Sequence, residues 1–352
     1  RENVEWGTAN LNLGRGEVQS FLISNALFWM KYFHIDGFRV DAVSNLIYYH
    51  GNQDNGINEG ALYFLKKLSK RIFEENPHAL LIAEDSSAYP KVTHPVDHGG
   101  LGFNYKWNMG WMNDTLKYFQ KDPVYRKYHH HDLTFSLHYA FFENFILPLS
   151  HDEVVHGKHT LVEKMPGDYW QKFANYRALI GYFYTHPGKN LLFMGQEFGH
   201  MHEWKDYTEL DWPLLNYPMH QKTAAYNSAF NKLIKNEKAL YECDHQPKGF
   251  QWLDKDNSEQ SIISFVRYAK DRSNHLVMIL NLTPMVHHDF HLGVPYKGTY
   301  KEILSSDYEQ FGGSNIFNGS PLHTFDKANH GCQQSINITV PPLSITVFKW
   351  SR

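Results

Sequence analysis

The sequence predicts an α/β protein that forms part of a (β/α)8 TIM barrel and continues into an all-β C-terminal domain. Three buried strands each lead into an acidic residue, and strands, polar loops and helices alternate over the first two thirds of the chain. Acidic groups at the C-terminal ends of several parallel strands are typical of such a barrel. An open doubly wound sheet would more often carry a glycine-rich phosphate-binding turn, which the sequence lacks.

The first acidic strand is the segment 37–42. Phe38 and Val40 alternate with Arg39 and Asp41, which is the two-residue period of a strand. Arg39 and Asp41 are therefore expected on the same side of the strand, where the guanidinium keeps the carboxylate ionised and oriented. On this hexapeptide alone, a purely structural ion pair is the simpler interpretation.

Two later segments repeat the pattern. Residues 79–83 are a continuous apolar run that ends in Glu84, and residues 145–149 are a second run that leads into His151 and Asp152. Such runs are expected of parallel strands that are buried on both faces. The repetition favours a functional role for the three carboxylates.

Helices are expected between these strands, because apolar residues recur at spacings of three and four. The predicted helices are residues 17–33, 59–75, 111–119, 168–184 and 224–236, and two further barrel strands are residues 101–107 and 190–194. Short strands separated by turns follow at residues 249–253, 261–268, 275–282, 299–304 and 336–349. We therefore expect a barrel portion over residues 1–235 and an all-β sandwich over residues 236–352.

Composition excludes several classes of protein. The net charge of −3 gives no attraction to nucleic acid or to an anionic membrane surface. No apolar run approaches the length of about 18 residues that a membrane-spanning helix needs. The two cysteines, Cys243 and Cys332, are far apart, which excludes a disulfide framework and favours a reducing, cytoplasmic compartment.

A metal site is not expected. The run His129-His130-His131-Asp132 contains the side chains that metals prefer, but adjacent residues point in different directions, and metal sites usually draw on spaced ligands.

Asp41, Glu84 and Asp152 are candidates for carboxylate catalysis. Two carboxyl groups about 5 to 5.5 Å apart are what a retaining glycosidase needs. One attacks the anomeric carbon, and the other protonates the departing oxygen and then acts as a base. His151 is a candidate for hydrogen bonds to sugar hydroxyls. An aspartic-protease-like or metal-binding use of the acids is the alternative, although Arg39 disfavours a cation beside Asp41.

At these residues the sequence resembles the α-amylase superfamily, and within it the 1,4-α-glucan branching enzymes. The resemblance implies that Asp41 is the nucleophile, Arg39 an anion-binding residue, and Glu84 the general acid and base. It implies that Asp152 and His151 stabilise the transition state. The segments that carry these roles are residues 37–42, 83–87 and 149–158.

Longer segments are similar to branching enzymes rather than to hydrolases. These segments are residues 105–115, 151–158, 167–175 and 191–199. The implied reaction cleaves an internal α-1,4 bond of glycogen or amylose, forms a covalent glucosyl-enzyme at Asp41, and transfers the chain to a glucose 6-hydroxyl to make an α-1,6 branch. The resemblance implies no cofactor.

The family places its nucleophile on the fourth barrel strand, whereas 40 residues precede Asp41 here. The resemblance therefore implies that only about strands four to eight are present, with bare sheet edges and exposed apolar faces. We expect the isolated chain to be inactive or weakly active, and the missing N-terminal half of the enzyme to be a partner. A superfamily hydrolase, such as a maltooligosyl-trehalose trehalohydrolase, and an inactive glucan-binding fragment are the alternatives.

Overall fold

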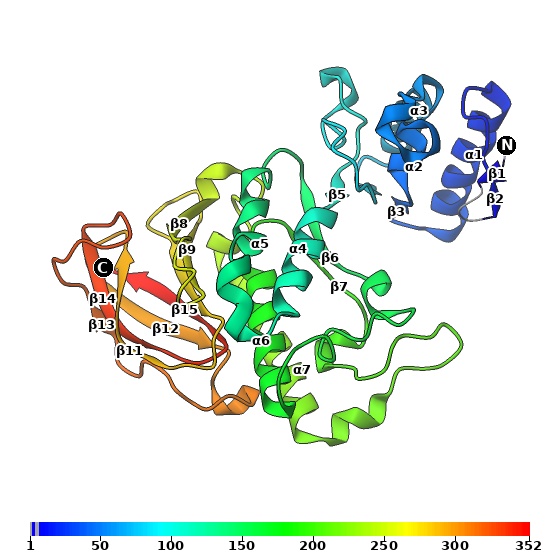
Figure 1. Cartoon of the computed structure of the whole chain (residues 1–352). Coiled ribbons are helices and arrows are strands. Elements are labelled where there is room, and N and C mark those ends of the chain that lie inside the picture. The colour runs from blue at the N-terminus through cyan, green and yellow to red at the C-terminus, as the bar shows by residue number, and fades with distance from the viewer. Residues whose placement is uncertain (1, 4–6) are drawn as a thin grey trace. The chain divides into compact units, whose positions relative to one another are not determined.

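The computed structural model describes residues 2–3 and 7–352, and it divides into two compact units that are considered separately. Unit 1 contains residues 1–110 and 139–146, and unit 2 contains residues 111–138 and 147–352. Figure 1 labels the helices and strands of both units.

Unit 1 repeats the order of helix and parallel strand that the sequence predicts. Its helices are α1 (Gly16–Phe33), α2 (Val43–Ile47) and α3 (Glu59–Glu75), and its strands are β1 (Glu2–Asn3), β2 (Thr8–Ala9), β3 (Gly37–Val40), β4 (Leu80–Ala83) and β5 (Tyr105–Trp107). The strand β6 (Phe145–Leu149) crosses from unit 1 into unit 2. Strands β3, β4, β5 and β6 pair in parallel in that order, with Val40 opposite Ala83 and Trp107 opposite Ile146.

The sheet is open. Its strand order is β3-β4-β5-β6-β7, where β7 is Lys189–Leu192, so β3 and β7 are the two end strands. Within the described residues β3 pairs with β4 alone. This arrangement agrees with the expectation of a barrel represented by about strands four to eight.

The core of unit 1 lies between α3 and the sheet. Leu65 and Ile72 of α3 are fully buried in one cluster with Leu81 of β4. Helix α1 contacts α3, but of its residues only Gln19, Ile23 and Met30 are buried. Most of the apolar residues that define its helical pattern are exposed or half-buried instead. The four aromatic residues at the end of α1 are exposed and pack against one another: Phe28, Trp29, Tyr32 and Phe33.

Unit 2 is built around a buried helix, α6 (Tyr169–Thr185). Asp168 begins this helix with a capping box, in which its side chain accepts from the backbone N–H of Gln171. Every residue from Phe173 to Thr185 is buried, because α6 contacts the C-terminal sheet as well as a second long helix. The other helices of this unit are α4 (Met109–Phe119), which starts at the end of unit 1, α5 (His131–Thr134) and α7 (Pro218–Asn236).

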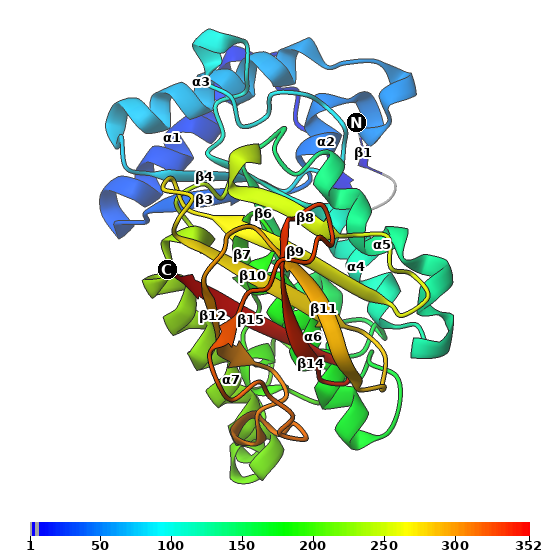
Figure 2. The ribbon, with the colours of Figure 1, turned by 90° about the vertical axis from the view of Figure 1, so that its left-hand side faces the viewer.

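Two antiparallel sheets form the C-terminal part of unit 2, and Figure 2 shows them in the foreground. The larger sheet has the strand order β13-β12-β15-β10-β9-β8, and the smaller sheet pairs β11 with β14. The strands are β8 (Phe250–Asp254), β9 (Ile262–Tyr268), β10 (His275–Asn281), β11 (His287–Val294), β12 (Thr299–Ser305), β13 (Leu322–His323), β14 (Gln334–Val340) and β15 (Ser344–Ser351). Buried apolar residues from both sheets form one core, as expected for a sandwich.

Three details of this domain differ from the sequence prediction, and the first is the two-residue strand β13, which was not predicted. The segment predicted as one strand over 336–349 is two strands, β14 and β15, because Pro341 and Pro342 interrupt the ladder and Leu343 adopts a left-handed conformation. The strand β11 was not predicted, because its histidines and Asp289 hide the alternation of apolar residues.

Three fully buried arginines join the helices of unit 2 to its β domain. Arg126 donates to the carbonyl oxygens of Phe119 and Leu282, at 3.0 and 2.8 Å. Arg177 of α6 donates to carbonyls in the loop after β12. Arg267 of β9 donates to the last residue of α6 and forms an ion pair with a buried aspartate.

Short 3-10 helices connect these elements at Tyr49–Gly51, Gln53–Asn55, Val96–His98, Pro123–His129, Phe135–His138, His151–Val154, Gln196–Phe198, Trp212–Asn216, Lys238–Leu240, Pro247–Gly249 and Glu309–Phe311. None of the helices in the described chain is both long enough and apolar enough to cross a membrane.

Candidate active site

The candidate site in unit 1 lies where β3 and β4 end. Val40 and Ala83 are paired in the parallel register, so the next residues, Asp41 and Glu84, leave the sheet side by side.

Arg39 and Asp41 form the ion pair that the alternation predicts. Arg39 Nη2 lies 2.8 Å from Asp41 Oδ1. The guanidinium carbon lies 4.3 Å from the ring centroid of Trp107, the last residue of β5, so the charge is also held against an aromatic face. The side chain of Asp41 is 73% exposed, and its carboxylate is therefore accessible to a substrate.

Ala42, the residue after Asp41, links the end of β3 to the end of β4 through a hydrogen bond. It has a left-handed backbone conformation, with φ 47° and ψ 47°, which turns the chain sharply after Asp41. In this conformation the Ala42 amide donates to Glu84 Oε2 at 2.6 Å, and the Val43 amide donates to the Glu84 carbonyl at 2.8 Å. The turn therefore fixes both the backbone and the carboxylate of Glu84.

Asp85, the residue after Glu84, forms a buried ion pair with Lys106. Asp85 Oδ2 and Lys106 Nζ are 2.8 Å apart, and their side chains are 0% and 6% exposed. Lys106 also donates to the Ser87 carbonyl at 2.7 Å, and the Ser87 amide donates to Asp85 Oδ1 at 2.9 Å. These bonds fix the chain that follows Glu84.

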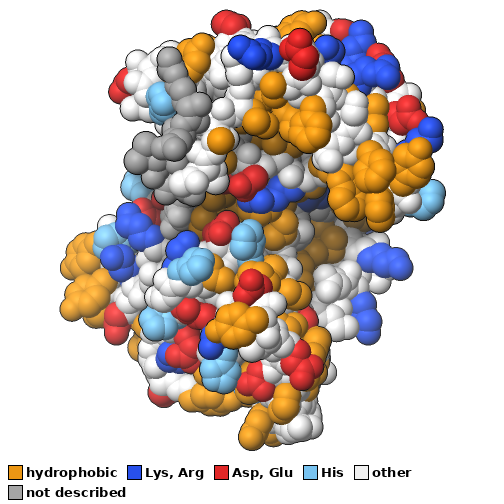
Figure 3. All heavy atoms as spheres, turned by 90° about the vertical axis from the view of Figure 1, so that its right-hand side faces the viewer, with side chains coloured by type: hydrophobic (Ala, Val, Ile, Leu, Met, Phe, Trp, Pro, Cys, Tyr) orange, Lys and Arg blue, Asp and Glu red, His pale blue; other side chains and the backbone are white. Residues whose placement is uncertain are grey.

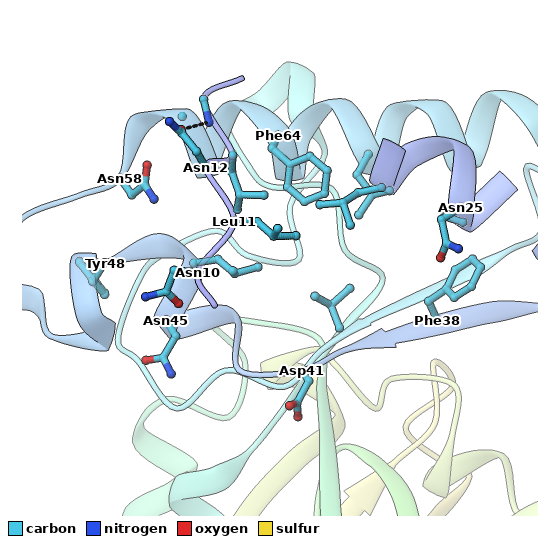
Figure 4. A pocket seen from close by; sticks show the side chains of 18 of the residues that line it. Asn10, Leu11, Asn12, Asn25, Phe38, Asp41, Asn45, Tyr48, Asn58 and Phe64 are labelled. Carbon is cyan, nitrogen blue, oxygen red and sulfur yellow. Dashed lines mark hydrogen bonds between the residues drawn. The ribbon is translucent and has the colours of Figure 1, made fainter. Parts of the chain in front are cut away.

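A cavity of about 950 Å³ opens beside this site within unit 1. Its lining combines apolar side chains, such as Leu11 and Phe64, with several asparagines. Figure 4 shows Asp41 at the end of β3 with its carboxylate directed away from Leu11 and Phe64. Figure 3 shows hydrophobic side chains gathered on the surface of this unit.

His151 and Asp152 lie in unit 2, directly after the fully buried strand β6. Ser150 and Glu153 form a capping box at this point, which fixes the turn that presents them. His151 Nε2 lies 3.3 Å from Asp152 Oδ1, and both side chains are partly exposed. The His151 ring also contacts the rings of Phe193 and Trp204.

The structure thus brings Arg39, Asp41 and Glu84 together in unit 1, and His151 and Asp152 together in unit 2. Sequence reasoning missed Ala42 and Trp107 as supporting residues. Ala42 lies in the predicted segment 37–42, but nothing in the sequence indicates that this residue adopts a left-handed conformation. Trp107 lies in the predicted strand 101–107, but nothing in the sequence places it against Arg39.

The histidine run after α4 does not gather ligands. His129 Nδ1 lies 3.8 Å from Asp132 Oδ2, and His130 is buried, which lowers its pKa. In residues 2–3 and 7–352, no group of three or more His, Cys, Asp or Glu side chains is placed to hold a metal ion.

Comparison with known proteins identifies the family. The model of the alpha amylase catalytic domain matches residues 4–270, and that of the alpha amylase C-terminal all-beta domain matches residues 252–351. The chain is 53% identical over 349 residues to the 1,4-alpha-glucan branching enzymes GlgB of Bacillus anthracis (strain CDC 684 / NRRL 3495) and Bacillus mycoides (strain KBAB4), covering 99% of this chain. It spans 54% of the length of each of these relatives.

The fold agrees with this assignment. The structure is similar to a crystal structure of the α-amylase from Geobacillus thermoleovorans in complex with acarbose, with a TM-score of 0.65 and 16% identity. That match covers 99% of this chain and 67% of the amylase chain. The chain therefore belongs to the α-amylase family, with an α-amylase catalytic domain followed by the all-β C-terminal domain of that family.

Proposed function

We propose that this chain carries the catalytic carboxylates of a 1,4-α-glucan branching enzyme. The reaction cleaves an α-1,4 bond of glycogen or amylose and transfers the released chain to a glucose 6-hydroxyl, which forms an α-1,6 branch. The identity of 53% to GlgB enzymes along almost the whole chain supports the choice of acceptor. The paired ends of β3 and β4 support the chemistry, because they present Asp41 and Glu84 side by side.

Asp41 is the proposed nucleophile. Its carboxylate attacks the anomeric carbon, a C–O bond forms to Asp41, and the bond to the departing glycosidic oxygen breaks. Arg39 orients the attacking carboxylate through the contact at 2.8 Å. The stacking of Arg39 on Trp107 restricts the guanidinium to this direction.

Glu84 is the proposed general acid and base. It first gives its proton to the departing oxygen. As a carboxylate it then takes the proton of the acceptor 6-hydroxyl, whose oxygen attacks the anomeric carbon and releases Asp41. The hydrogen bond from the Ala42 amide orients the Glu84 carboxyl group in both steps.

Asp152 and His151 are proposed to bind sugar hydroxyls and to stabilise the oxocarbenium-like transition state. The proposed organisation is a barrel portion over residues 1–235 and an all-β domain over residues 236–352. The proposed location is the cytoplasm. A further polypeptide portion, corresponding to the rest of the length of the relatives, is proposed as the partner that activity requires.

The test is incubation of amylose with this chain, alone and together with the N-terminal portion of a GlgB relative. The products are followed by proton NMR for α-1,6 anomeric signals. We expect these signals only when both portions are present. Asp41→Asn and Glu84→Gln should abolish the signals, while Asp97→Asn, which changes an exposed carboxylate in the same unit, should not.

Other outcomes are informative. New reducing ends without α-1,6 signals would make the protein a hydrolase of the family. Binding of amylose without either product would make it a glucan-binding fragment. Full branching by the chain alone would contradict the need for a partner.

A further inference from the structure

The segment after β6, residues 151–159, contains little regular secondary structure. It begins with a single 3-10 turn and continues without regular structure. His156, Gly157 and His159 have φ values of 56°, 79° and 63°. A left-handed conformation costs a residue with a side chain about 1 to 2 kcal/mol, so the two histidines need support from outside the segment.

Glu203, in the loop after β7, provides one such support. Its Oε2 accepts from the Gly157 amide at 3.0 Å, and its Oε1 accepts from the His159 amide at 2.6 Å. Each carboxylate oxygen therefore binds one backbone N–H of the strained part. Hydrogen bonds to an ionised acceptor are stronger than those between neutral groups.

Trp204, the next residue, holds the beginning of the same segment. Its backbone amide donates to the Val154 carbonyl at 3.0 Å. Its ring meets the His151 ring edge-on, with centroids 6.2 Å apart and planes at 79°. Phe193 lies against both rings, at 5.2 Å from Trp204 and 6.0 Å from His151. The imidazole of His151 is thus held by two aromatic neighbours.

Lys164 supports the segment by binding its carbonyl groups. Its ammonium donates to the carbonyl oxygens of Glu153 at 2.6 Å and His159 at 2.7 Å, and also to that of Lys158. The Lys158 side chain in turn donates to the Asp152 carbonyl at 2.8 Å. The amides of the segment are therefore bound by a carboxylate, and its carbonyls by ammonium groups.

From these contacts we propose that Glu203 and Trp204 are positioning residues for His151 and Asp152. Lys164 assists them by binding the carbonyl groups of the same segment. They act through the backbone of residues 151–159 and through the His151 ring. This inference rests on the proposed function only for its effect on catalysis. The conformation of the segment is independent of that function.

The first test is hydrogen exchange of the full chain as wild type and as Glu203→Gln. A glutamine keeps the shape of the side chain but replaces one acceptor oxygen with a donor. We expect the Gly157 and His159 amides to exchange at least about tenfold faster in the variant, which corresponds to the loss of a hydrogen bond to a charged group. Glu209→Gln, at an exposed position in the same loop, is the matched control and should leave both rates unchanged.

The second test follows the His151 ring by NMR. Trp204→Leu should move the imidazole Cε1–H resonance of His151, because the ring current of Trp204 is lost. Trp204→Phe retains an aromatic edge and should restore most of the shift. Unchanged exchange in Glu203→Gln, or an unchanged His151 resonance in Trp204→Leu, would overturn the inference.

The third test measures branching by the chain together with the N-terminal portion. Glu203→Gln should lower kcat about tenfold and change KM for amylose less than about twofold, since misplaced stabilising groups affect the transition state more than binding. A loss of protection that extends into β10 would instead make Glu203 an ordinary structural residue. If the wild type forms no branches, the proposed function fails, and the exchange and resonance measurements still decide the inference.

Discussion

The Ala42 amide donates to Glu84 Oε2 at 2.6 Å, and Ala42 itself is in the left-handed region. A residue adjacent to the proposed nucleophile therefore orients the proposed acid and base. The two carboxyl groups are coupled by the backbone as well as by the sheet.

The left-handed conformation of Ala42 predicts that substitution by glycine increases stability. Ala42→Gly should stabilise unit 1 by about 1 kcal/mol, because glycine adopts positive φ without steric cost. Ala61→Gly, in the first turn of α3, should destabilise it by about 1 kcal/mol. Chemical denaturation compares the two. Equal losses of stability in both variants would show that Ala42 is not strained.

The stacking of Arg39 predicts that lysine is not an adequate substitute. Arg39→Lys keeps the charge but loses the planar group on Trp107, so transfer should fall at least about tenfold. The stability should change by less than about 1 kcal/mol, because the Asp41 side chain of this ion pair is 73% exposed. Arg71→Lys, in an exposed ion pair on α3, is the control for rate and stability. Wild-type transfer in Arg39→Lys would contradict the orienting role.

The buried pair of Asp85 and Lys106 predicts a large effect on stability. Lys106→Met leaves Asp85 as a buried charge without its ammonium partner, and should destabilise unit 1 by about 3 to 5 kcal/mol. The double variant with Asp85→Asn should recover part of this loss. Lys117→Met, which changes a lysine whose side chain is 58% exposed, should cost less than about 1 kcal/mol. Strictly additive losses in the double variant would argue against coupling of the pair.

Two buried histidines predict that unit 2 loses stability in acid. Burial lowers the pKa of His186 to about 3 and that of His275 to about 4. Below the ordinary pKa of about 6.5, the unfolded chain binds protons that the folded chain excludes. The free energy of unfolding should therefore fall as pH drops from about 6.5 towards 4, by about 1.4 kcal/mol per histidine and pH unit.

Hydrogen exchange of unit 2 at pH 7 and pH 5 measures this dependence. His275→Gln should reduce the slope, and His78→Gln, at an exposed position in unit 1, should leave it unchanged. An identical slope in His275→Gln and the wild type would mean that His275 is protonated in the folded protein.

The sequence predicted those features that depend on neighbours along the chain. The alternation around Arg39 predicted the ion pair with Asp41, and the apolar run before Ser150 predicted β6 with the bounds that the structure shows. Features that depend on distant residues were not predictable. Glu203 binds amides that lie more than forty positions away, and nothing in its own surroundings in the sequence indicates this.

The exposed aromatic end of α1 was missed for a related reason. The apolar residues of α1 recur at helical spacing, but this spacing does not show whether another part of the chain packs against them. The strand β11 was missed because polar side chains on its exposed face concealed the period.

The three buried arginines have a consequence for any attempt to shorten the protein. The guanidinium group of each arginine donates to at least one carbonyl group across the junction between the helices and the β domain. A chain cut after residue 235 would remove Leu282, which accepts from Arg126, and the loop after β12, which accepts from Arg177. The helices of unit 2 and the β domain therefore depend on each other for these hydrogen bonds. We expect the two parts to unfold in one thermal transition.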